Sequence, residues 1–107
     1  MRMYYTDYTE YAIRNYCRML AGGYTTDGAA EVLKTNAERE NWNACKAAFE
    51  EMTVLEQNVA IAIYGPRVDD FGKAIADYSE RSGISKNDVW GICNKIVRMV
   101  ARKRGLI

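Results

Sequence analysis

The sequence contains no histidine, a single proline and only three cysteines among its 107 residues. Without histidine the chain lacks the side chain most often used as a general base at neutral pH and as a metal ligand. It also has no glycine-rich phosphate-binding loop, and no serine or cysteine stands beside a recognisable base. We therefore expect no enzyme activity, no cofactor and no metal site.

The cysteines Cys17, Cys45 and Cys93 are odd in number, far apart, and each lies beside apolar positions. This pattern predicts buried free thiols in a reducing compartment rather than a disulfide framework. No stretch approaches the ~18 apolar residues of a membrane span, and the start MRMYYTDYTEY lacks the apolar core of a signal peptide. We expect a cytoplasmic protein without membrane contact.

Apolar residues make up 49% of the chain and charged residues 27%, which is ordinary for a globular protein. Long segments of helical periodicity and few strand-like alternations predict an all-α fold, a small helical domain of about five or six helices. We expect residues 1–51 to form a helical region that packs on residues 52–107, within one compact domain. The helices are expected at about 6–20, 28–34, 35–52, 53–64, 69 or 70 to 82, and 85–104.

Local signals place the ends of these helices. Thr6 or Asp7 is expected to cap the first, and Thr26 or Asp27 the second. The stretches TNAE from Thr35 and TVLE from Thr53 have capping-box spacing. The helix that follows Thr53 is apolar nearly all round until Gly65-Pro66, which predicts a place in the middle of the core.

The first helix is unusually rich in tyrosine. Such rings could stack on single-stranded bases, form a dimer interface, or pack on the next helix and leave their hydroxyls at the rim. The packing interpretation is favoured on general grounds. The residues concerned are Tyr4, Tyr5, Tyr8, Tyr11 and Tyr16.

The spacing within residues 78–106 is that of a helix-turn-helix. Small Ser79 lies four residues before the turn glycine Gly83, and apolar Val89 lies six after it. Apolar Tyr78, Ile84 and Ile92 would hold the two helices together. One position departs from the pattern, because Ser82 stands where an apolar residue usually points inward.

The last predicted helix, from Ser85 to Arg104, has two faces at ~100° per residue. The apolar face holds Val89, Ile92, Cys93, Ile96 and Val100, and the opposite face holds Asn87, Gly91, Asn94, Arg98 and Arg102, flanked by Lys86 and Lys95. Asparagine and lysine can address base edges and arginine can address phosphates, although such residues also occur on solvated faces. Trp90 lies at the boundary between the two faces. This position favours packing against the core or a partner over contact with DNA.

Charge is unevenly distributed. Residues 86–107 carry six basic side chains and one acidic, a charge of +5, which leaves −4 on residues 1–85 of a chain whose total is +1. A basic segment on an acidic body fits a polyanion contact. It fits equally well the general preference of cations for helix C-termini.

The stretches MTVLEQNVAIAIYG, YSERSGISKNDVW and KIVRMVARKRG occur in an order that resembles region 4 of bacterial sigma factors. Small regulators of phage and mobile elements, such as the ArpU and RinA families, are similar in this half. The resemblance implies a helix-turn-helix with six residues directed toward the major groove: Ser85, Lys86, Asn87, Trp90, Gly91 and Asn94.

These patterns lead to the hypothesis of a small DNA-binding transcriptional regulator. Its phosphate contacts would come from Lys95, Arg98, Arg102, Lys103 and Arg104. A homodimer is compatible with this hypothesis because one helix-turn-helix reads only a short half-site. RNA polymerase or another protein is a further candidate partner. The alternative is a helical protein–protein interaction module that uses the same scaffold without binding DNA.

Overall fold

The computed structural model describes residues 4–24, 26–66 and 70–107. These residues form an all-α protein, as the sequence predicts, and contain no strand. The helices are α1 (Thr6–Ala21), α2 (Thr26–Val32), α3 (Asn36–Glu51), α4 (Val54–Tyr64), α5 (Phe71–Ser82) and α6 (Lys86–Arg104).

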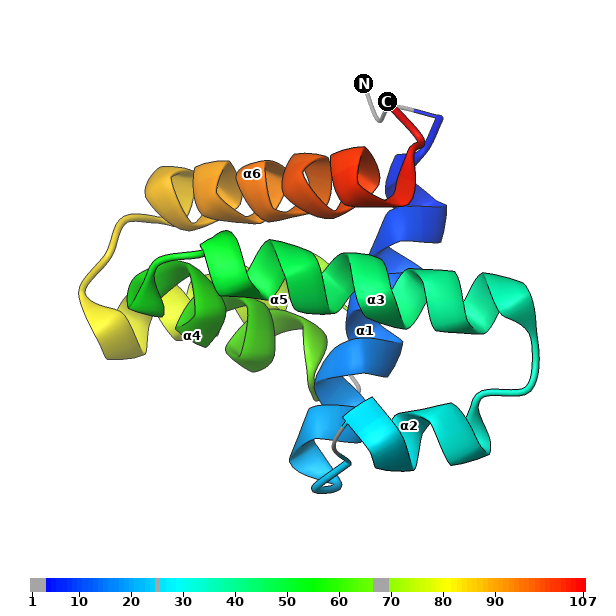
Figure 1. Ribbon diagram of the computed structural model, residues 1–107. Helices are drawn as coiled ribbons and strands as arrows, with labels where there is room; N and C mark the ends of the chain where they lie inside the picture. The colour runs from blue at the N-terminus through cyan, green and yellow to red at the C-terminus, as the bar shows by residue number, and fades with distance from the viewer. Residues whose placement is uncertain (1–3, 25, 67–69) are drawn as a thin grey trace.

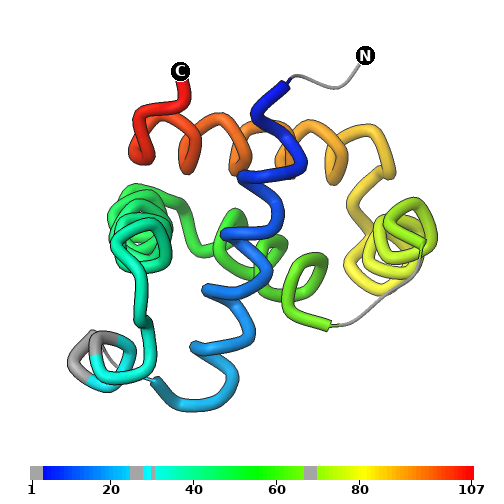
Figure 2. The backbone as a smooth tube through the Cα atoms, turned by 90° about the vertical axis from the view of Figure 1, so that its right-hand side faces the viewer, coloured from blue at the N-terminus to red at the C-terminus, as the bar shows by residue number. Residues whose placement is uncertain are grey.

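The long helix α6 lies over the other helices. In Figure 1 it runs along the top above the oppositely directed α3, with α4 and α5 toward its N-terminal end. Figure 2 shows α1 descending between α3 on one side and α5 on the other, with α6 crossing above. The two ends of the described chain also meet, because the Tyr4 hydroxyl donates a hydrogen bond of 2.8 Å to the Leu106 carbonyl.

The side-chain caps that start most of the helices follow the sequence signals. The Thr35 hydroxyl accepts a bond from the Glu38 N–H at 3.1 Å, and the Thr53 hydroxyl does the same for Glu56 at 3.1 Å. Each glutamate completes its capping box by accepting the N–H of its threonine. These two short patterns therefore placed the starts of α3 and α4 correctly.

The predicted caps of the first two helices were wrong, although α1 begins at Thr6 as expected. Tyr5 occupies the N-cap of α1 without a side-chain cap, because Thr6 and Asp7 already belong to the helix. Helix α2 begins at Thr26 rather than about Gly28, so Thr26 and Asp27 lie within it. At the start of α5 the Asp70 carboxylate accepts the Lys73 N–H at 3.2 Å, and the preceding predicted connection, 66–69, extends beyond the described residues.

A single apolar cluster draws on both halves of the chain, from Tyr5 to Ala101. In its centre the Tyr16 ring lies 4.6 Å from Trp42 and 4.9 Å from Phe49, measured between centroids. Helix α3 contributes Trp42, Cys45 and Phe49 to this cluster from its buried side. Among the tyrosines of the first helix region, Tyr5 and Tyr16 pack in this core, whereas Tyr4, Tyr8 and Tyr11 are exposed.

The three thiols are buried and free, as predicted. Burial raises the pKa of each of Cys17, Cys45 and Cys93 to about 12, because an apolar surrounding disfavours the thiolate.

Helix α4 differs from its prediction. Val59, Ala60, Ile63 and Tyr64 are buried, but Val54 is 73% exposed, Leu55 44% and Ile61 46%. The helix is apolar nearly all round, yet α1, α5 and α6 cover only one side of it. Its place in the middle of the core was therefore predicted wrongly.

Candidate nucleic-acid interface

Helix α6 begins after a tight turn at Gly83. Gly83 ends α5 with a φ of +77°, a left-handed conformation that glycine adopts without steric cost. The Ser85 hydroxyl then caps α6 by accepting the Asp88 N–H at 3.2 Å. Ser79 supports the turn from α5, because its hydroxyl donates to the Ile84 carbonyl.

Ser82, the departure from the expected pattern, has a local role. It is exposed, and its hydroxyl accepts the Ile84 N–H at 3.2 Å. The position therefore does not point into the core, so a polar side chain is tolerated and fastens the turn instead.

One side of α6 is buried and the other faces outward. The buried residues are Val89, Cys93, Ile96, Val97, Val100 and Ala101, while Ile92 is half-buried. The exposed residues on the opposite side, which we call the outer face of α6, are Asn87, Gly91, Asn94, Arg98 and Arg102. The helical periodicity thus assigned the polar positions correctly to the surface.

The space in front of the outer face is open. A Cβ added to Gly91 would meet no atom within 4 Å. No packing contact therefore explains the glycine, and at this position the helix backbone can approach a large ligand closely. The Asn87 and Asn94 amides flank it and form no hydrogen bond with other described residues.

Trp90 belongs to the edge of the core. Its ring lies edge-on to Phe71 at 5.1 Å, and Phe71 in turn lies 5.6 Å from Tyr64. Trp90 still exposes 38% of its surface beside the outer face. This position fits the packing interpretation, although the exposed edge of the ring remains accessible to a partner.

Three of the five predicted phosphate-contacting residues form ion pairs within the chain. Lys95 Nζ lies 2.6 Å from Glu56, Lys103 Nζ lies 2.6 Å from Glu51, and Arg104 lies 3.1 Å from Glu40. The first of these bonds lowers the pKa of the Glu56 carboxyl, with a smaller contribution from the Thr53 N–H. These cations therefore interact with acidic residues of α3 and α4 when no ligand is bound.

Arg104 is the most firmly held of the three. Its Nε also donates to the Asn41 side-chain oxygen at 2.7 Å, and Asn41 in turn bonds the Tyr8 hydroxyl. This connection joins α1, α3 and α6. No sequence pattern predicts this connection, because Asn41 and Arg104 are 63 residues apart.

The other three cations of α6 face solvent. Within the described part of the chain, Lys86, Arg98 and Arg102 are exposed and their side chains form no ion pair or hydrogen bond. Arg98 and Arg102 are one helical turn apart on the outer face, and Lys86 lies at the start of the helix. A localised positive charge therefore remains beside two uncommitted amides.

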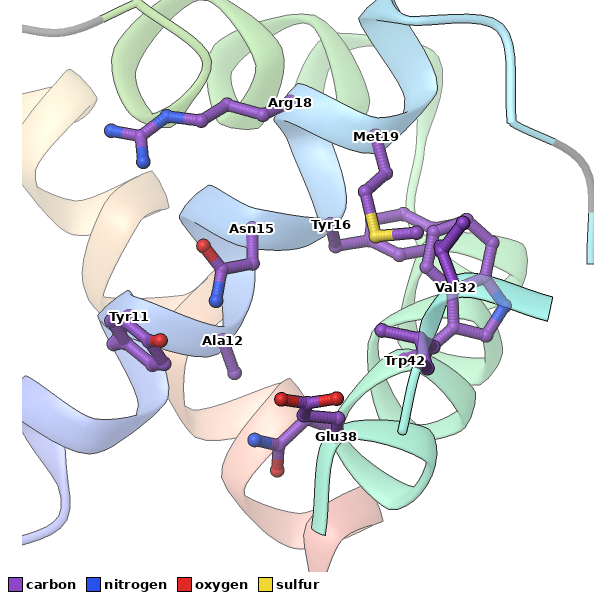
Figure 3. A pocket seen from close by; sticks show the side chains of 11 residues that line it. Tyr11, Ala12, Asn15, Tyr16, Arg18, Met19, Val32, Glu38 and Trp42 are labelled. Atoms are coloured by element: carbon purple, nitrogen blue, oxygen red, sulfur yellow. The ribbon is translucent and has the colours of Figure 1, made fainter. Parts of the chain in front are cut away.

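A separate pocket of about 300 Å³ lies between α1, α2 and α3. In Figure 3 Asn15 points into it, Val32 and Trp42 line one side, and Arg18 extends away. None of the residues predicted to contact DNA lines this pocket, so it is distinct from the α6 surface.

No three histidine, cysteine, aspartate or glutamate side chains among residues 4–24, 26–66 and 70–107 gather as metal ligands would. In the same ranges, the helices are too short or too polar to cross a bilayer.

Comparison of the chain with known proteins gives no match to a protein-family model, a curated protein or a solved structure. The resemblance to sigma-factor region 4 therefore stays a prediction from sequence pattern.

Proposed function

We propose that this protein binds double-stranded DNA and regulates transcription by inserting the N-terminal half of α6 into the major groove. In this proposal α5 and α6 act as a helix-turn-helix. The observation that carries it is the outer face of α6, where two free amides, an open glycine and two free arginines follow one another along an exposed helix. An α-helix fits the width of the major groove of B-DNA.

The outer face divides into two parts. Near the helix start, Ser85, Lys86, Asn87, Gly91 and Asn94 face the base edges, and Trp90 borders them. Further along, Arg98 and Arg102 approach phosphates. Lys95, Lys103 and Arg104 contribute less than the sequence alone indicates, because each must first leave an ion pair with a glutamate.

A pair of substitutions tests this division. Asn87→Ala is expected to relax sequence preference, because an asparagine amide can bond adenine in a bidentate manner, worth about 1–3 kcal/mol of discrimination. Arg102→Ala is expected to weaken binding by a similar factor on every sequence, because phosphates carry no sequence information. Selection from a random duplex library, followed by band-shift titration of selected and random duplexes, measures both effects.

Asn43→Ala provides a matched control. Asn43 is an exposed asparagine of α3, outside the proposed interface, and its removal should change neither affinity nor preference. Equal losses from Asn43→Ala and Asn87→Ala would contradict the assignment of the outer face.

A protein–protein interaction module is the second candidate. Trp90 favours it, because an aromatic side chain with 38% of its surface exposed is a common anchor for a protein partner. The two candidates differ in a simple experiment. A module without DNA binding would show no band shift with random or selected duplex even at low salt.

A further inference from the structure

The exposed side of α4 forms a mainly apolar stripe with one asparagine at its centre. Residues 54, 58 and 61 lie one above another at helical spacing, with 55 and 62 beside them. We call this set the α4 stripe: Val54, Leu55, Asn58, Ile61 and Ala62. All but Ala62 are exposed, and Ala62 is half-buried. A helix that is apolar all round normally has all of its sides covered.

The α4 stripe carries no charge. The one charged residue of α4, Glu56, is buried on the other side of the helix, where its carboxylate lies 2.6 Å from Lys95 Nζ. A partner with a strongly charged surface therefore has nothing to pair with on this stripe. An uncharged apolar surface is the better match for it. A second copy of the α4 stripe is such a surface, and the pair has no like-charge repulsion.

Asn58 makes the stripe complementary to itself. It lies midway along the stripe, exposed, and its amide bonds no other described residue. A side-chain amide is both donor and acceptor. Two copies of Asn58 that meet on a twofold axis can thus satisfy each other, and a single polar residue in an apolar helix contact fixes its register.

We propose that two copies of this chain form a homodimer through antiparallel pairing of their α4 stripes. Val54 of one copy then lies against Ile61 of the other, and the two Asn58 amides face each other at the centre. The small side chain of Ala62 lets the helix backbones approach. The proposal does not rest on DNA binding, because the stripe lies opposite Glu56 on α4 and so points away from α6.

The outer face of α1 is a poorer candidate for this contact. Its exposed tyrosines, Tyr8 and Tyr11, share that side of the helix with Asp7, Arg14 and Arg18. A symmetric pair would have to desolvate several of these charges. The α4 stripe avoids that cost.

The interface is small. Eleven residues of helix extend about 16 Å. The area buried between two such helices is therefore at the low end of the range for protein–protein interfaces, below about 1,200 Å² in total. The dimer should accordingly dissociate on dilution.

Sedimentation velocity over a concentration series from about 5 to 500 μM tests the proposal. We expect the mass to rise from that of the 12.2 kDa chain toward twice that value. Asn58→Asp should keep the protein monomeric throughout, because it brings two carboxylates together, and Ile61→Glu should do the same. Asn87→Asp, the same substitution on the exposed side of α6, is the control and should leave the dimer intact.

A chain that remains monomeric at the highest concentration would overturn the homodimer. So would a dimer that persists in both α4 variants. Because the readout is mass without DNA, loss of the dimer and loss of DNA binding are observed separately. The circular dichroism of each variant should match that of the original chain, since both substituted side chains are exposed.

Discussion

Arg102 and Lys103 are neighbours in the sequence but have different surroundings. Arg102 is exposed without a side-chain partner in the described chain, whereas Lys103 is bound to Glu51 at 2.6 Å. The charge pattern predicts phosphate contact for both residues, because it does not reveal a partner 52 positions away. At the scale of single residues the sequence predicted exposure well and pairing poorly.

Release of Lys103 should strengthen the proposed DNA binding. Glu51→Gln removes its anionic partner, so Lys103 becomes available to a phosphate and affinity for random duplex should rise about two- to tenfold, the equivalent of up to one added contact. Stability should change little because exposed ion pairs contribute at most about 1 kcal/mol.

The control for this variant is Glu31→Gln. Glu31 is an exposed glutamate of α2, which lies below the core on the side away from α6 (Figure 1). The substitution changes net charge equally. An equal rise in affinity for both variants would show that overall charge, and not release of Lys103, is responsible.

At the scale of elements, the turn before α6 depends on its backbone conformation. Gly83→Ala should destabilise the fold by about 1–2 kcal/mol, because an alanine at φ +77° strains the backbone although its Cβ would meet no atom within 4 Å. Gly91→Ala is also free of contacts within 4 Å but lies inside a helix, so it should stabilise by up to about 1 kcal/mol. Urea unfolding of both variants measures the difference, and a loss of stability from Gly91→Ala similar to that from Gly83→Ala would contradict this account of the turn.

Helix types and the caps of the later helices were predictable because they depend on residues three or four positions apart, whereas the predicted caps of α1 and α2 were wrong. The capping boxes at Thr35 and Thr53, the cap at Ser85 and the turn at Gly83 all fall in this class. The exposure of α4 was not predictable, because it depends on how many helices are available to cover it. A sequence that is apolar all round specifies only that its sides need covering; it does not specify whether the cover belongs to the same chain.

At the scale of the whole molecule, composition determines how stability depends on pH. The sequence has no histidine, so no side chain with an unperturbed pKa titrates between about pH 6 and 8, and stability should be nearly constant there. Above about pH 9 it should fall. The thiols of Cys17, Cys45 and Cys93 have pKa values raised to about 12 in the folded state, so the unfolded chain loses its protons first and is favoured as pH rises.

Below about pH 5 the stability of the fold should decrease as the pH is lowered. Glu56 has a lowered pKa in the folded state, chiefly because of its hydrogen bond with Lys95. Its contribution is therefore present above the unfolded pKa and is lost as pH falls through the lowered value. Urea unfolding from pH 4 to pH 10, with a reductant present, should give a plateau with losses at both ends. A steep change in the free energy of unfolding between pH 6 and 8 would contradict the expected plateau.

The salt dependence of DNA binding tests the central claim most directly. If Arg98 and Arg102 contact phosphates, log K should fall with log salt, and the double variant Arg98→Ala/Arg102→Ala should make that slope shallower by about 2. Fluorescence anisotropy with a labelled random duplex at four or five salt concentrations gives both slopes. No binding at low salt, or the same slope for the original chain and the double variant, would contradict the proposal that the outer face of α6 binds DNA.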